Sequence, residues 1–202
     1  MVSSVAVRRN GTVRVVVWRR VLATAAAIGL VAAVADADAN NGSVVPGRPT
    51  IEIWKSQRKM ELRYGTYVDR TFSVMLGRVP RLAKEERGDY RTPVGRYFIA
   101  YKKPSRFDRF LGISYPNIED AERGYQRGLI SANQWADIYF ANLTYNPPTS
   151  RTPLGGMVGI HGFGDREYMP IDWTEGCIAV SNDEIEYLYE FVPVGTPVTI
   201  HE

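Results

Sequence analysis

The sequence predicts a mainly β domain, a β sandwich or mixed barrel, with a helical lid insertion and a helix after the single cysteine. Short apolar stretches separated by turn residues recur through residues 50–101, which is typical of sheets with tight connections. The middle of the chain instead has helical spacing of its apolar residues. One cysteine excludes an internal disulfide, so a hydrophobic core must stabilise the domain.

Alternation of apolar and polar residues predicts the first strands. Residues 51–53 and 60–64 alternate on either side of the polar stretch 56–59, which is a hairpin pattern. Residues 72–76 are expected to form a third short strand. After a charged loop and a turn containing proline and glycine, residues 96–101 are expected to form another strand.

The middle of the chain is expected to form a helical insertion from about residue 104 to 156. Residues 118–127 and 131–140 have the spacing of short helices, and residues 144–156 form a loop rich in Pro, Gly and Thr. Insertions of this length without strands often carry function. We expect this one to act as a lid over a site.

The last part of the chain returns to strand, helix and strand, at residues 157–161, 182–191 and 197–200. The folded domain is expected to span residues 50–202. A linker rich in Gly, Pro and Asn precedes it at residues 40–49.

Positive charge is concentrated at the N-terminus. The whole chain has 25 Lys and Arg and 22 Asp and Glu, a net charge of +3. Residues 1–39 hold five arginines and two aspartates, which leaves 20 basic and 20 acidic groups in the rest. A body without net charge has no basic excess to attract nucleic acid, so nucleic acid is not an expected partner.

Residues 1–39 are predicted to be a signal peptide. A basic stretch ending at Arg20 runs into an apolar tract, and the small residues around Asp36 and Asp38 fit the small-x-small cleavage rule. The tract is short for a bilayer-spanning helix, which needs about 20 residues. An uncleaved N-terminal anchor is the alternative. The protein is therefore expected to be exported to the periplasm or cell envelope.

A histidine and a cysteine are the candidates for chemistry. His161 ends an apolar strand and precedes Gly162, and imidazole exchanges protons near neutral pH. Cys177 follows Gly176, a residue that lets backbone amides approach an oxyanion. A solitary thiol is an oxidation hazard in an exported protein. Cys177 and His161 are therefore candidates for a catalytic pair.

Other uses of these two residues stay open at this point. A free cysteine can be a small buried hydrophobe, and a histidine can be a hydrogen-bonded core group. Metal binding is poorly supported, because two scattered ligands do not make a zinc site. The chain has neither the Gly-x-Ser-x-Gly elbow of serine hydrolases nor a phosphate-binding glycine motif. No metal or cofactor is expected.

Four motifs occur in a fixed order along the chain. They are Thr92-Pro93-Val94-Gly95, Ile160-His161-Gly162, Thr174-Glu175-Gly176-Cys177-Ile178 and Gly195-Thr196-Pro197-Val198. Together they resemble the L,D-transpeptidase catalytic domain family of bacterial cell-wall enzymes, over residues 50–200. The sequence Asp-Trp-Thr-x-Gly-Cys-Ile-Ala at residues 172–179, with Ser-Tyr-Pro-Asn upstream at residues 114–117, resembles a branch that also includes murein hydrolases. Glu175 and Ala179 stand where the family most often has histidine and arginine, which leaves substrate choice open.

The resemblance implies a cysteine acyltransferase acting on peptidoglycan. Cys177 is expected to form a thioester with a stem-peptide carbonyl at diaminopimelate, and His161 to carry the proton. Backbone groups at Gly176, Cys177, Glu175 and Gly162 are expected to surround the oxyanion. Transfer to an amine gives a 3→3 cross-link, whereas transfer to water makes the protein a murein endopeptidase or carboxypeptidase. An inactive wall-binding module is a third possibility.

Five residues are expected to line the substrate groove, and core packing is the alternative for the aromatic ones. They are Phe107, Tyr115, Asn117, Trp173 and Thr174. The expected partners are peptidoglycan stem peptides and an amine acceptor, which can be a wall-attached protein. Membrane contact is expected only through an uncleaved N-terminal segment.

Overall fold

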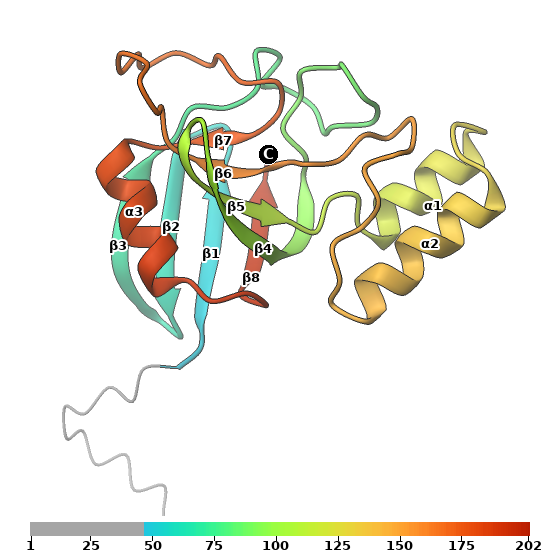
Figure 1. Ribbon diagram of the computed structural model, residues 1–202, viewed down its shortest axis with the longest axis horizontal. Helices are drawn as coiled ribbons and strands as arrows, with labels where there is room; N and C mark the ends of the chain where they lie inside the picture. Colours follow the sequence, from blue (N-terminus) through green and yellow to red (C-terminus); the bar gives the residue numbers. More distant parts are fainter. Residues whose placement is uncertain (1–46) are drawn as a thin grey trace, which may run out of the picture. The chain divides into compact units, whose positions relative to one another are not determined.

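One curled mixed sheet organises the domain (Figure 1). The computed structural model describes residues 47–202, so the predicted signal peptide at residues 1–39 and most of the linker at residues 40–49 lie outside the described residues. The strands lie side by side in the order β3-β2-β1-β8-β4-β5-β6-β7. Their bounds are β1 Pro49–Trp54, β2 Lys59–Tyr64, β3 Tyr67–Ser73, β4 Gly95–Ser105, β5 Asp108–Ile113, β6 Gly159–His161, β7 Ile178–Ala179 and β8 Pro197–His201. The predicted mainly β class is confirmed.

The C-terminal strand β8 joins the two halves of the sheet. It pairs parallel with β1, where Ile53 lies opposite Ile200, and antiparallel with β4, where Arg96 lies opposite Thr199. On the other side of β1, the β1–β2 hairpin pairs Ile51 with Leu62. The predicted hairpin and the predicted strands at residues 96–101 and 197–200 are therefore confirmed.

The third strand lies earlier than predicted. β3 covers Tyr67–Ser73 rather than residues 72–76. It begins early because Gly65 adopts a φ of 61°, a left-handed conformation that suits a tight turn directly after β2. Residues 74–76 leave the β2 ladder, and Met75 forms only an isolated bridge with Ala179 of β7.

The predicted insertion at residues 104–156 contains a strand, which corrects the expectation that it has none. β4 continues to Ser105, and β5 returns antiparallel to it and then pairs with β6. The turn between them is closed by Asp108, whose φ is 71°. From Phe110 to Ile113 every residue of β5 is buried, so the strand shows no alternation, and Gly112 is needed there because a Cβ would lie 2.4 Å from the Tyr101 ring.

Three helices complete the described chain: α1 Ile118–Gln126, α2 Ala132–Leu143 and α3 Asn182–Phe191. All three were predicted, and each begins with a capping box that satisfies its first amides. α1 and α2 pack together through a small apolar cluster, and Figure 1 shows them beside the sheet rather than over β6 and β7. Within residues 47–202, no helix combines the length and apolar character needed to cross a bilayer.

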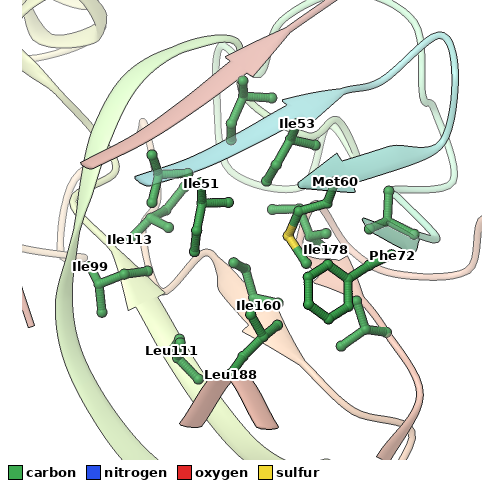
Figure 2. Packing of buried hydrophobic residues seen from close by; sticks show 14 of the residues in the cluster. Ile51, Ile53, Met60, Phe72, Ile99, Leu111, Ile113, Ile160, Ile178 and Leu188 are labelled. Carbon is green, nitrogen blue, oxygen red and sulfur yellow. The ribbon is translucent and has the colours of Figure 1, made fainter. Parts of the chain in front are cut away.

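The main core lies between the inner face of the sheet and α3 (Figure 2). Ile160 of β6, Ile178 of β7 and Leu188 of α3 are fully buried in it. Burying side chains of this size contributes about 1.5–3 kcal/mol each. β6 and β7, the last two strands in sheet order, are short, so this packing against α3 is what holds them in place.

We expect Asn117→Ala to destabilise the fold by about 1 kcal/mol. The Asn117 side chain accepts a hydrogen bond from the Asp120 amide at the start of α1 and donates one to the Arg96 carbonyl of β4. Chemical denaturation measures the loss. Asn117→Ser keeps a neutral capping oxygen for the Asp120 amide and should lose less stability. Equal stability of Asn117→Ala and the wild type would contradict this role.

Candidate active site

The pairing of β6 with β7 places His161 and Cys177 on one face of the sheet. The two strands are parallel, and His161 lies opposite Ala179. Cys177 stands two residues before Ala179, and side chains two apart on an extended chain point to the same face. Both residues line one cavity of about 840 Å³. The structure thus brings together the two residues predicted to do chemistry.

The His161 ring is buried and held in one orientation. It is 3% exposed and stacks on Phe107, with ring centroids 4.7 Å apart, while Trp173 packs edge-on at 5.6 Å. Its Nδ1 lies 2.7 Å from the Gly162 carbonyl oxygen. A carbonyl only accepts, so Nδ1 carries the proton and Nε2 is left as the acceptor.

The surroundings of His161 keep its imidazole neutral. Burial lowers its pKa, the bond to Gly162 opposes this, and the nearby charges of Arg106 and Arg166 lower it further. At neutral pH the ring is therefore an uncharged base whose Nε2 can accept a proton.

The Cys177 thiol is half-buried, and its sulfur lies 3.7 Å from the Met157 carbonyl oxygen. Burial raises its pKa to about 11, against the opposing effects of the Gly159 amide and the Lys84 charge. The exposed carboxylate of Glu175 adds to the rise. The resting pair is consequently a neutral thiol and a neutral imidazole, not a thiolate and an imidazolium.

The Thr174 side chain closes the turn that carries the cysteine. Its hydroxyl donates to the Cys177 carbonyl at 2.7 Å and accepts from the Gly176 amide at 3.1 Å. Gly176 has a φ of 127°, and a Cβ there would lie 2.6 Å from the Arg91 carbonyl oxygen. The turn therefore requires glycine before the cysteine.

The turn also decides which amide is available to an oxyanion. The Gly176 amide, which was predicted to face the oxyanion, is already bonded to Thr174. The Cys177 amide has no hydrogen-bond partner among residues 47–202. Of the two amides, that of Cys177 is the one that can donate to a ligand.

Residues 48–200 match the family model of the L,D-transpeptidase catalytic domain, YkuD. The chain belongs to this family. It is 24% identical over 156 residues to the putative L,D-transpeptidase YqjB of Bacillus subtilis, covering 77% of this chain and 73% of that protein. A shorter stretch of 47 residues, 23% of this chain and 15% of the relative, is 40% identical to the probable L,D-transpeptidase ErfK/SrfK of Salmonella typhimurium.

The fold is similar to that of the helical cell shape determining protein Pgp2 from Campylobacter jejuni. The TM-score is 0.55 at 21% identity, and the match covers 77% of this chain and 48% of that one. The chain thus spans about half the length of that protein.

Three of the five predicted groove residues line the cavity, and two do not. Phe107, Trp173 and Thr174 border it. Tyr115 is 1% exposed and donates to the Leu154 carbonyl, and Asn117 is 5% exposed and caps α1. Their place on the insertion is the reason that the sequence predicts them in the groove. Their side chains instead attach the helical pair to the sheet.

The helices of the insertion do not line the cavity, so they are not the lid that was expected. The walls come from the β4–β5 turn and from loop residues such as Gly156 and Met157. Glu175 lines the cavity, whereas Gly162 does not and packs against α3 instead. Within residues 47–202 no three potential metal ligands come together.

Several cavity residues were not predicted. They are mainly cationic side chains from distant loops, including Lys84, Arg106 and Arg166. No local pattern distinguishes them from ordinary surface charges. The tertiary fold alone brings them beside the cysteine.

We expect the Cys177 thiol to remain protonated below about pH 9, because burial raises its pKa. The thiolate ultraviolet absorbance, taken as wild type minus Cys177→Ala, should rise only above that pH. The subtraction removes the signal from tyrosines. A titration step near neutral pH would instead show a preformed thiolate–imidazolium pair.

Proposed function

We propose that this protein is a peptidoglycan L,D-transpeptidase in which Cys177 and His161 form the catalytic pair. Membership of the family supports the reaction class. The observation that carries the assignment of residues is that a thiol and a neutral imidazole, with Nε2 as its acceptor, line the same cavity. The substrate is the stem peptide of peptidoglycan, attacked at its diaminopimelate carbonyl.

Acylation begins with transfer of the thiol proton from Cys177 to Nε2 of His161. The sulfur then bonds to the carbonyl carbon, and the carbonyl electron pair moves to the oxygen, which the Cys177 amide can stabilise. Collapse of this intermediate breaks the bond to the terminal D-alanine. The departing amine takes the proton from His161, and a thioester remains on Cys177.

The raised pKa of Cys177 fits this order of events. Because the thiol is protonated at rest, a base has to remove its proton during the attack, and His161 is neutral and able to do so. A thiolate of high pKa is also the stronger nucleophile once formed.

Deacylation decides between cross-linking and hydrolysis. Attack by the side-chain amine of a second stem peptide forms an amide and releases the thiol, giving a 3→3 cross-link. Attack by water would release a shortened peptide instead. We propose the amine as acceptor, in keeping with the transpeptidase family.

We further propose that residues 1–39 act as the export signal. Peptidoglycan lies in the cell envelope, so the enzyme must leave the cytoplasm to reach it. The basic stretch and apolar tract of these residues support this step.

We expect the full chain to convert tetrapeptide muropeptides into 3→3 cross-linked dimers. Cys177→Ala should abolish the reaction because it removes the nucleophile. His161→Ala should slow acylation by about 10²–10⁴-fold because it removes the base. Product separation with mass spectrometry measures both effects.

Arg109→Gln is a suitable control, because Arg109 pairs with Glu186 and does not line the cavity. Tripeptide as the sole product would contradict amine transfer. If a carbapenem acylates Cys177 in His161→Ala as fast as in the wild type, the imidazole is not part of the mechanism. Unchanged activity in Cys177→Ala would contradict the whole assignment.

A further inference from the structure

The cavity is strongly cationic, although residues 40–202 carry no net charge. Glu175 is the only acidic residue that lines it in the described part of the chain. The basic residues that line it are Arg78, Lys84, Arg87, Lys103, Arg106 and Arg166. Charges of one sign gathered around a cleft attract a ligand of the opposite sign.

Some of these basic side chains already form ion pairs within the protein. Lys84 lies 2.7 Å from an oxygen of Asp89, and Arg78 lies 3.7 Å from Glu175. By contrast, Arg106 and Arg166 have no carboxylate within 4.0 Å among residues 47–202. Their side chains also make no hydrogen bond to the described protein. These two guanidinium groups are available to a ligand.

Both guanidinium groups lie over the aromatic wall beside His161. Their central carbons lie 4.8 Å (Arg106) and 5.6 Å (Arg166) from the Phe107 ring centroid. Arg166 also lies 4.9 Å from the Trp173 ring. Phe107 in turn stacks on His161. Two like charges are therefore held at one ring, next to the reacting groups, an arrangement that an anion would stabilise.

The segments that carry the two arginines are fixed to each other by backbone contacts. The Gly162 amide donates to the Phe107 carbonyl at 3.0 Å. Gly164 has a φ of 62°, and a Cβ there would lie 2.2 Å from the Arg106 carbonyl oxygen. The Asn182 side chain both accepts from and donates to the Gly164 backbone. This anchoring reduces the ordering cost when a ligand binds.

We propose that Arg106 and Arg166 form a carboxylate-binding subsite that recognises a free carboxylate of the donor stem peptide. This proposal rests on the proposed function, which supplies the donor. A guanidinium group pairs with a carboxylate through two parallel hydrogen bonds, a geometry that a neutral amide does not match. The subsite therefore makes the enzyme select donors with free carboxylates over donors whose carboxyl groups are amidated.

Binding to the full chain carrying Cys177→Ala tests the subsite without turnover. Isothermal titration compares a tetrapeptide donor that has free carboxylates with its amidated forms, each amidated at one position. We expect one amidated form to bind about 10-fold more weakly. Arg106→Gln and Arg166→Gln should each weaken binding of the free form by about 5–10-fold and reduce its advantage over that amidated form.

Arg109→Gln is the matched control, since it removes the same charge outside the cavity and should leave the preference unchanged. With Cys177 restored, the Arg106 and Arg166 variants should raise KM for the free donor more than they lower kcat. Unchanged thermal stability in both variants separates a binding role from a structural one.

Equal binding of free and amidated donors, with Cys177-dependent turnover intact, would overturn the subsite and leave the proposed function standing. A preference that survives in both glutamine variants would overturn the assignment to these arginines. Absence of binding by every donor, together with absence of turnover, would overturn both the subsite and the function.

Discussion

The parallel pairing of β6 with β7 is the interaction on which the site depends. It sets His161 opposite Ala179 and so brings Cys177 to the same face of the sheet. A shift of one residue in this register would turn the thiol to the opposite face, away from the imidazole. The two strands share only a few residues, so the register is maintained by their neighbours: β5 pairs with the other edge of β6, and α3 follows β7 directly and covers the core beneath it.

Much of the fold could be predicted because its signals are local. The hairpin at β1 and β2, the three capped helices and the closing strand all have alternation, spacing or capping residues that identify them within a few positions. β5 was missed for a physical reason: from Phe110 onward its residues are all buried, so it shows no alternation, and its Gly112 is required by the neighbouring Tyr101 ring, a contact between strands that no local pattern reveals. The same limit applies to helices α1 and α2. Their position depends on the side chains that they pack against, which no local pattern reveals.

One part of the candidate site could be predicted from the sequence. It consists of rare residue types that lie beside turn glycines. Cys177 and His161 stand out in the sequence, and the fold brings them together. Tyr115 and Asn117 were placed in the groove by their position on the insertion, and burial shows that they connect elements instead. Thr174 lines the cavity as expected, yet its hydroxyl is engaged in shaping the cysteine turn. The cationic side chains could not be predicted, because their shared location arises only when distant loops fold.

Burial and charge act on the proposed catalytic pair, Cys177 and His161, in a way that would link catalysis to the donor. Without a donor, burial keeps the Cys177 thiol protonated, which protects it from oxidants because the thiolate is the reactive form. The same burial, with the charges of Arg106 and Arg166, opposes formation of the imidazolium on His161. If the proposed subsite binds a donor carboxylate, that carboxylate would offset those two charges and raise the pKa of His161. In the proposed mechanism, proton transfer from the thiol would then be easier in the complex than in the free enzyme, so the nucleophile would form where its substrate is already bound.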